Sequence, residues 1–393
     1  MQRPSRRKRG TGTPWGVALL IALTLTAVAC APSREKSAQG GATTPGATSG
    51  AGTPQLTDDF SAQHAKWASE TVDTAKFRKD PPYNVAMIVQ GPTNGWGTIF
   101  DTVMRYELKQ SGKVKSTLYV PWDGTTESQA NGIDDAIAKK VDVIVLTALS
   151  RAGLKAPVER AVAAGIPVVT CMATVAGDGP TVDVSRNLPV MGYESAKALA
   201  GKLNGKGNVV LLHGIAGVDA AEFWKSGAHA ALKEFPGIKI VAEENGNWSV
   251  SDSLDRMRAV LTAQPKIDGV WVGGLEMGVS VINAFKDAGR QLPVMAGTNP
   301  INGFLRLAIE NKVDFVAAPF PPGASKLCVD TMLKVLNGES VPRFTEVASE
   351  MDGTQTFGAD EAKDFYRPQF NDDWIGPEVI PESAYLAAGF ARK

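Results

Sequence analysis

The stretch Val141–Thr147 (VDVIVLT) decides the fold class, because it is almost continuously apolar and has the length of a strand. Two neighbouring stretches share this character: Asn84–Gln90 (NVAMIVQ) precedes it and Ile166–Thr170 (IPVVT) follows it. Continuous runs of Val and Ile are typical of strands that are covered on both faces, as in a parallel sheet between two layers of helices. Amphipathic stretches separate the runs, so this part of the chain is predicted to alternate strands and helices.

A second alternation of the same kind extends from Pro189 to Ala317, where the pattern predicts five helices and five strands in turn. Two consecutive open α/β units predict two doubly wound parallel-sheet lobes. Ligands of such sheets bind beyond the carboxyl ends of the strands. With two lobes facing each other, the expected ligand site is the cleft between them.

The N-terminus has the pattern of a lipoprotein export signal that ends at Cys30. Basic residues between positions 3 and 9 are followed by an apolar run from Trp15 to Ala27 and by small residues directly before the cysteine. The run is too short for a helix that spans a membrane in the mature protein. The pattern resembles the lipobox of bacterial lipoproteins, although that motif usually has Leu where Ala27 stands. An ordinary secretory signal with a chance cysteine is the alternative.

The segment from Ala31 to about Gln55 consists almost entirely of Ala, Gly, Ser, Thr and Pro. Such a composition cannot bury enough apolar surface to offset the entropy of ordering, which predicts a flexible leash. Together, residues 1–29 are predicted to be a signal peptide, and residues 30–56 the lipidated cysteine and its leash. The protein is therefore expected to be extracytoplasmic, held by lipid at the outer face of the cell membrane.

Charge and cysteine content narrow the class further. Five of the 41 basic residues and none of the 41 acidic ones lie in the first 29 positions, so the chain after them carries a net charge of −5. The sequence has no stripe of basic residues of the kind that binds nucleic acid, so nucleic acid is not expected as a partner. Beyond Cys30 only Cys171 and Cys328 remain, so at most one disulfide is possible within the lobes, and we expect both residues to be buried core residues.

Several phrases, taken in order, resemble the type I periplasmic binding proteins of ABC importers, in particular the ribose-binding-protein branch. The resemblance covers about Asn84 to Val341. The phrases are Gly165–Thr170 (GIPVVT), Val182–Asn187 (VDVSRN), Leu212–Gly217 (LHGIAG) with Asp219-Ala220-Ala221, and Ala263–Val270 (AQPKIDGV). The family implies two lobes joined by a multi-strand hinge. We expect residues 80–186 and 319–343 in the first lobe, and residues 187–318 and 344–393, including a C-terminal tail, in the second.

The family also implies a function: a monomeric substrate-binding protein that closes on a small solute and delivers it to an ABC permease and its ATPase. A sugar or polyol is the default solute. The residues that bind sugars in this branch are, however, replaced. Cys171-Met172 stand where an Asp-Arg pair is usual, Glu222 replaces an arginine, Gly274-Leu275 replace an Asn-Asp pair, and Thr298 replaces an aspartate.

The residues left at the expected strand ends are aromatic, apolar, amide or acidic. Aromatic faces stack on a sugar ring, on a planar ring or on a cation, while the polar side chains fix orientation. The predicted ligand-binding residues are Asn94, Trp96, Trp122, Asp123, Cys171, Met172, Glu222, Trp224, Asn247, Trp248, Glu276, Thr298, Asn299 and Phe320.

No catalytic, cofactor or metal site is predicted. The three histidines, His64, His213 and His229, share no metal-ligand spacing. Nucleophile-elbow, phosphate-loop and dinucleotide-glycine patterns are lacking in the sequence, so an enzyme is not expected. Two alternatives stay open: a sensor that docks on a membrane receptor kinase, and a binding protein for a less hydroxylated, aromatic or apolar solute.

Overall fold

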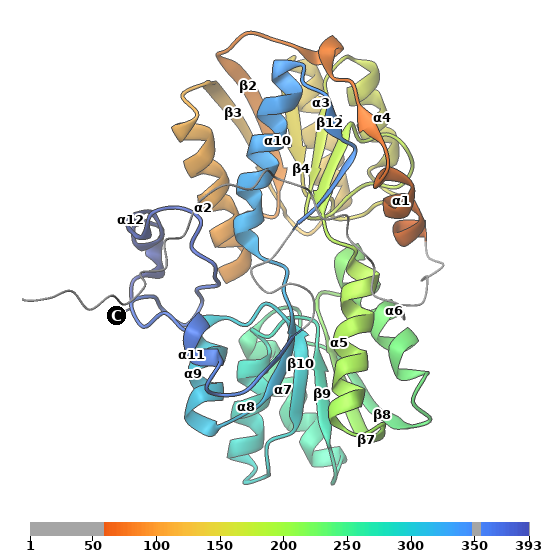
Figure 1. The fold of residues 1–393 in the computed structure, drawn as a ribbon, viewed down its shortest axis with the longest axis vertical. Coiled ribbons are helices and arrows are strands. Elements are labelled where there is room, and N and C mark those ends of the chain that lie inside the picture. The colour runs from red at the N-terminus through yellow and green to blue at the C-terminus, as the bar shows by residue number, and fades with distance from the viewer. Residues whose placement is uncertain (1–58, 348–354, 393) are drawn as a thin grey trace, which may run out of the picture. The chain divides into compact units, whose positions relative to one another are not determined.

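Two six-stranded sheets organise the part of the chain that the computed structural model describes, residues 59–347 and 355–392 (Figure 1). The predicted signal peptide, the lipidation site at Cys30 and the leash lie outside the described residues. None of the helices in the described part of the chain is long and apolar enough to cross a bilayer.

The first sheet has the strand order β13-β6-β5-β4-β2-β3, and all of its neighbouring strands are parallel. The apolar runs of the sequence form its central strands, as predicted. Its strands are β2 (Tyr83–Val89), β3 (Val114–Pro121), β4 (Val143–Leu146), β5 (Val168–Cys171), β6 (Val182–Ser185) and β13 (Phe344–Glu346). Its helices are α2 (Gly95–Gln110), α3 (Thr126–Ala138), α4 (Lys155–Ala163) and α10 (Ser325–Asn337).

Helices cover this sheet on both faces, which is why its strands lack a polar side. Along β4, Val143 and Val145 belong to the core shared with α2 and α10, whereas Ile144 and Leu146 belong to a separate core under α3 and α4. All four side chains are fully buried. The alternation of side chains along a strand therefore divides one apolar run between two cores.

The second sheet has the order β14-β11-β10-β9-β7-β8 and is parallel except for β14, which runs antiparallel to β11. Its strands are β7 (Lys206–His213), β8 (Gly237–Asn245), β9 (Gly269–Val272), β10 (Val294–Thr298), β11 (Phe315–Ala318) and β14 (Gln355–Phe357). Its helices are α5 (Leu188–Lys202), α6 (Asp219–Leu232), α7 (Val250–Ala263), α8 (Gly278–Asp287) and α9 (Asn302–Asn311).

The chain passes between the two sheets directly after β6 and again after β11, through the short 3-10 turn Pro322–Ala324 to α10. A third passage, between β13 and β14, includes residues 348–354, which lie outside the described part. Phe344–Glu346 pairs with β6 in the first sheet. The change of lobe therefore comes after residue 346, rather than after residue 343 as the sequence indicated. Two short strands, β1 (Thr71–Val72) and β12 (Val341–Pro342), pair antiparallel with each other in a separate two-stranded sheet.

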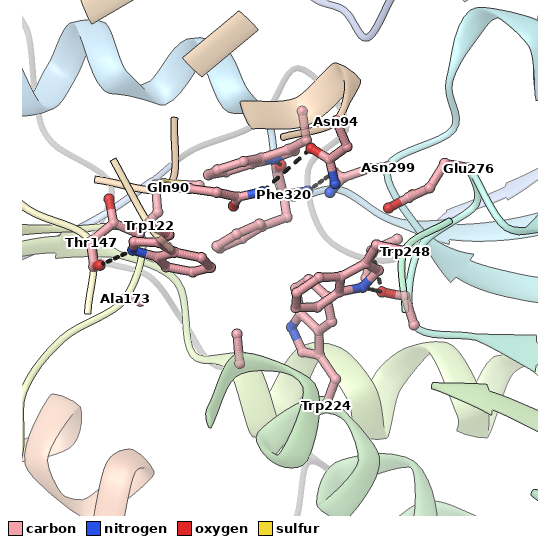
Figure 2. Close-up of a pocket in the computed structure, with 15 residues that line it drawn as sticks. Gln90, Asn94, Trp122, Thr147, Ala173, Trp224, Trp248, Glu276, Asn299 and Phe320 are labelled. Atoms are coloured by element: carbon pink, nitrogen blue, oxygen red, sulfur yellow. Dashed lines mark hydrogen bonds between the residues drawn. The ribbon is translucent and has the colours of Figure 1, made fainter. Parts of the chain in front are cut away.

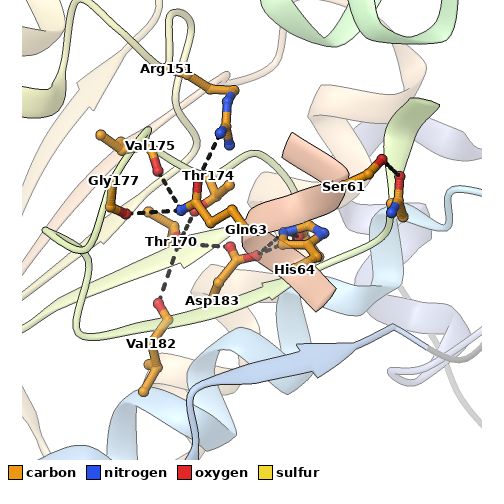
Figure 3. Close-up of polar contacts among 12 residues, drawn as sticks. Ser61, Gln63, His64, Arg151, Thr170, Thr174, Val175, Gly177, Val182 and Asp183 are labelled. Atoms are coloured by element: carbon orange, nitrogen blue, oxygen red, sulfur yellow. Dashed lines mark hydrogen bonds and ion pairs between the residues drawn. The ribbon is translucent and has the colours of Figure 1, made fainter. Parts of the chain in front are cut away.

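Helix α1 (Asp59–Trp67), which the sequence analysis did not predict, contacts both lobes (Figure 3). Its Ser61 hydroxyl donates to Asn187 Oδ1 at the start of α5, 3.1 Å away, and its Phe60 ring lies 4.9 Å from that of Phe223 on α6. His64 reaches the first sheet, where its Nε2 is 2.9 Å from Asp183 Oδ2. The segment directly after the predicted leash is thus fixed beside the first crossover between the lobes.

The carboxylate of Asp183 is the centre of this contact and is completely buried. Besides His64, it accepts hydrogen bonds from the hydroxyls of Ser185 (2.6 Å) and Thr170 (2.7 Å). A buried carboxylate is tolerated when its lone pairs are satisfied in this way. The network therefore joins α1, β5 and β6 at one point.

Cys171 at the end of β5 and Cys328 on α10 form a disulfide across 157 residues of sequence, and both are fully buried. The expectation that both residues are buried is confirmed, and the one bridge that the sequence allowed is formed. Both ends lie in the first lobe, so the bond closes a loop that contains the whole second sheet except β14.

The C-terminal segment after β14 is mostly irregular, with two single-turn helices, α11 (Ala362–Phe365) and α12 (Glu382–Tyr385), and a final turn at Leu386–Phe390. Its anchor is the side chain of Asn302 on α9, whose Nδ2 donates to the carbonyls of Arg367, Phe370 and Asn371. Trp374 is buried in the tail's own aromatic cluster, stacked on Phe370 with ring centroids 4.7 Å apart.

Candidate ligand pocket

A pocket lies where the carboxyl ends of strands from both sheets meet (Figure 2). Its empty volume is about 480 Å³, including space that opens to solvent. Gln90, Thr147 and Met172 follow β2, β4 and β5 of the first sheet, while Gly273 and Asn299 follow β9 and β10 of the second. Parallel strands place their carboxyl ends at one edge of each sheet, so residues far apart in sequence converge here.

The pocket brings together ten of the fourteen residues that the sequence analysis selected. These are Asn94, Trp96, Trp122, Met172, Trp224, Trp248, Glu276, Thr298, Asn299 and Phe320. Five further lining residues were missed: Gln90, Thr147, Ala173, Ala220 and Gly273. Gln90 and Thr147 carried a usable signal, because each is the polar last residue of an apolar run and so stands at a strand's carboxyl end.

Four selected residues lie outside the pocket lining, each for a local reason. The carboxylate of Asp123 accepts from the backbone N–H and hydroxyl of Thr125, which lowers its pKa and commits it to a surface turn. Cys171 is held in the disulfide. Glu222 is exposed on α6, and Asn247 donates to Asp252, 3.0 Å away.

Five aromatic residues line the pocket, and backbone carbonyls fix three of the indoles. Trp96 Nε1 donates to Phe320 O (2.8 Å), Trp122 Nε1 to Thr147 O (3.0 Å) and Trp248 Nε1 to Gly273 O (3.1 Å). These indoles therefore offer a ligand their ring faces rather than their N–H groups. Figure 2 shows Trp122 and Trp248 on opposite sides of the pocket, with Phe320 between them.

Three lining residues of this pocket carry buried hydrogen-bonding atoms that lack a partner. Among the described residues, the buried atoms that lack a hydrogen bond include Thr147 Oγ1, Trp224 Nε1 and Glu276 Oε2, all on lining residues. Leaving a buried polar atom unpaired costs about 1–3 kcal/mol. Three such atoms around one cavity indicate a site at which a polar ligand supplies the missing partners.

Backbone conformations that cost energy are found at the same place. Met172, Trp248 and Asn299 have φ values of 64°, 52° and 47°, in the left-handed region that non-glycine residues seldom adopt. Such conformations persist where the surrounding structure enforces them, and they cluster at functional sites. The strained backbone aims Trp248 into the pocket and allows Asn299 Oδ1 to accept from Phe320 N, 2.7 Å away.

Glu276 is the one ionisable side chain among the pocket's described lining residues. The residue is partly accessible, but its Oε2 is buried and unpaired. Burial raises the pKa of this carboxyl to about 8. A hydrogen bond from the backbone of Glu276 lowers the pKa, but by less than burial raises it. Gly274 makes room for the carboxyl group, because a Cβ at that position would lie 2.5 Å from Glu276 Oε2.

A second polar cluster in the second lobe has donor atoms that could hold a metal ion. His213 Nε2 on β7 and His229 Nε2 on α6 lie 3.2 Å and 3.1 Å from Glu243 Oε2 on β8, a proximity that the sequence spacing did not predict. Lys225 Nζ is 3.9 Å from the same oxygen. Burial alone would raise the pKa of Glu243, but the hydrogen bonds from the two imidazoles lower it. Protein groups thus already satisfy this carboxylate.

Comparison with known proteins places the chain among solute-binding proteins. A sequence model of the periplasmic binding protein domain matches residues 85–340. The xylitol-binding protein of Mycolicibacterium smegmatis is 27% identical over 201 residues, which cover 51% of this chain and 57% of that protein. The D-apiose import binding protein of Actinobacillus succinogenes is 30% identical over 188 residues, or 46% of this chain and 59% of that protein. The matches thus span less than two thirds of these relatives.

Solved structures share the fold at low sequence identity. An ABC transporter solute-binding protein from Bacillus halodurans with bound myo-inositol has a TM-score of 0.65 and 20% identity, and the match covers 73% of this chain and 98% of that one. A protein from Actinobacillus succinogenes with bound D-allose has a TM-score of 0.62 and 24% identity, covering 72% of this chain and all of the other. These likenesses establish the two-lobed architecture.

Proposed function

The chain belongs to the periplasmic binding protein family, in its type I, ribose-binding-protein-like branch, and on this premise we propose that it is the substrate-binding protein of an ABC importer for a sugar or polyol. Its role is to capture the solute between the two lobes and to deliver it to the permease. The family binds solutes, so the chain has a binding role rather than a catalytic one. The ligand-binding residues are those that line the pocket.

The observation that carries this proposal is the combination of stacking faces and unpaired polar atoms in one cavity between the sheets. Trp122 and Trp248 offer flat apolar surfaces to the C–H face of a ring or chain, while Thr147 Oγ1 and Trp224 Nε1 lack partners that hydroxyl groups can supply. Relatives named for xylitol and D-apiose support the same solute class. Binding shifts the equilibrium between open and closed arrangements of the lobes, and the permease recognises the closed arrangement.

Lipid anchoring at Cys30 is part of the proposal and rests on the sequence of residues 1–30. A Cys30→Ala variant should leave the membrane fraction for the soluble one, while the parent chain stays in the membrane fraction until detergent is added. Retention of the variant in the membrane fraction would contradict the anchor.

A thermal-denaturation screen of the detergent-solubilised full chain tests the binding function. Pentoses, hexoses, pentitols, hexitols and inositols are added singly, beside amino acids and aromatic acids as other solute classes. A ligand that binds only the folded state stabilises it by about 2.7 kcal/mol at a hundredfold excess over its Kd, which raises the unfolding midpoint measurably. A shift confined to amino acids or aromatic acids would refute the sugar or polyol assignment.

Gly214 provides a test of the aromatic wall, because Trp248 lies where a side chain at position 214 would be. A Cβ built on Gly214 would stand 2.3 Å from Trp248 Cε2. We expect Gly214→Ala to displace the indole, break its hydrogen bond to Gly273 and weaken binding of the best solute in the screen about 10- to 100-fold, or about 1.4–2.8 kcal/mol. Isothermal titration calorimetry measures the change.

The matched control for this variant is Gly201→Ala on α5, where an added Cβ has no neighbour within 4 Å. That variant should bind the solute as the parent chain does and should be slightly more stable, because alanine favours a helix over glycine. Unaltered affinity in Gly214→Ala would show that Trp248 is not part of the binding surface.

A further inference from the structure

The charge and the aromatic surfaces of the pocket indicate a narrower class of solute than sugars and polyols in general. We propose that the transported solute is an amino sugar or amino polyol, whose protonated amine is bound by the carboxylate of Glu276 beside the faces of Trp122 and Trp248. The inference rests on the proposed function and specifies the ligand of the same pocket.

The first argument is charge. Within the described lining, Glu276 has no basic neighbour, and the family's arginine positions are occupied here by Met172 and Glu222. The space that adjoins the pocket on the side of the tail is bordered by one more ionisable residue in the described part, Asp373, which is also acidic. A solute with a positive charge therefore meets no cation of the protein and one carboxyl group directly in the pocket.

The second argument is the unpaired Oε2 of Glu276. A buried carboxylate oxygen without a donor is costly, and an ammonium group supplies both a donor and the opposite charge. Figure 2 shows Glu276 on the same side of the pocket as Trp248, with its carboxyl group directed inward. Because Gly274 leaves room behind it, the carboxyl group is seated against backbone rather than against a protein cation.

The third argument is the aromatic surface. The N–H groups of Trp122 and Trp248 are bound to backbone carbonyls, and both indoles are only partly buried, so their π faces are the surface that a ligand meets. Indole faces carry negative potential and attract ammonium groups. The two rings lie on opposite sides of the pocket, with Phe320 between them, and Trp248 is on the same side as Glu276.

A hydroxyl group could also donate to Glu276 Oε2, and protonation distinguishes the two ligands. With a pKa of about 8, the carboxyl of the free protein is mostly protonated at pH 7. An ammonium ion binds the carboxylate form, so its binding must release that proton. A neutral polyol can bind the protonated carboxyl group as it stands. Amine binding should therefore strengthen as the pH rises towards 8, whereas polyol binding should not.

The experiment compares matched solutes by isothermal titration calorimetry on the full chain in detergent at pH 6, 7 and 8. The pairs are D-glucitol with 1-amino-1-deoxy-D-glucitol, and myo-inositol with a monoamino inositol. We expect the amine of at least one pair to bind at least tenfold more tightly at pH 8. Its affinity should fall about 50-fold between pH 8 and pH 6, with release of about 0.9 proton at pH 7 when buffers of different ionisation heat are compared.

Glu276→Gln should abolish the preference for the amine and its pH dependence. Glu159→Gln, on an exposed side chain of α4, removes the same charge and should change neither. Tighter binding of the neutral member of both pairs, without proton release, would overturn the amine while leaving the receptor function intact. If neither these solutes nor any sugar in the screen binds, the proposed function fails and the amine fails with it.

Discussion

Removing the Cys171–Cys328 disulfide is expected to lower the free energy of unfolding by about 5 kcal/mol, the value that the chain-entropy model gives for so long a loop. The bond joins residues that are 157 apart in sequence, and all strands of the second sheet except β14 lie between them. Without the bond, the two ends of this loop are no longer joined in the unfolded chain, so the conformational entropy of the unfolded state increases. The folded chain also loses the covalent link between α10 and the carboxyl end of β5.

The loss should extend to ligand binding, because Met172, the next residue after Cys171, lines the pocket in a left-handed conformation. Relaxing β5 at its end lets this residue return to an ordinary conformation, away from the pocket. Urea denaturation of the Cys171→Ala/Cys328→Ala double variant measures the stability, and calorimetry with the best solute measures the affinity.

Two controls make the disulfide prediction specific. The parent chain treated with a reductant strong enough to cleave buried bonds should unfold at the same urea concentration as the double variant, and the reductant should not affect the double variant itself. A double variant as stable as the oxidised parent would show that the disulfide does not stabilise this fold.

Much of the fold could be predicted from the sequence, because a parallel strand that is covered on both faces appears in the sequence as a short, continuous apolar run. Val141–Thr147 and Asn84–Gln90 are short apolar runs that become β4 and β2 with little more than their ends trimmed. Most of the pocket could be predicted for the same reason: side chains just beyond strand ends converge in a doubly wound fold. Trp122 was found by this rule, and Thr298 by this rule together with the family's usual aspartate position.

The features that the sequence did not reveal depend on contacts between distant segments. The disulfide joins two residues of the first lobe that are 157 apart in sequence, and no local pattern indicates that they are close in the fold. Helix α1 has a short amphipathic sequence, and contacts with distant residues hold it in place, among them the buried pairing of His64 with Asp183. Glu222 follows the family's pattern in position, but in the structure it faces solvent on α6. The sequence of a single turn does not determine how a helix is rotated about its axis, and it is this rotation of α6 that directs Glu222 towards solvent.

Glu276→Gln is expected to make the ligand-free protein more stable by about 3 kcal/mol at pH 7. The carboxyl has a pKa of about 8 in the folded chain and an ordinary value of 4.5 when burial is removed. Between these values the folded state binds the proton more tightly than the unfolded state does. Stability of the parent chain therefore decreases as the pH rises from about 4.5 to about 8, by up to about 1.4 kcal/mol per pH unit.

Glutamine has nearly the same shape as the protonated carboxyl group and does not titrate, so this part of the pH dependence should vanish in the variant. The measurement is the difference in unfolding free energy between Glu276→Gln and the parent chain at pH 5, 6, 7 and 8, without solute. We expect the difference to be small at pH 5 and to increase at each step. Glu159→Gln, whose side chain is half exposed, should show no such increase.

A constant difference across this pH range would mean that the carboxyl group ionises as it does in water, and the pocket would then not be the weakly polar environment that burial of Glu276 implies. An increasing difference would instead show that the protein keeps a destabilising acid at the pocket. Because functional sites often retain groups that reduce stability in the absence of ligand, the increase would assign Glu276 to binding rather than to folding.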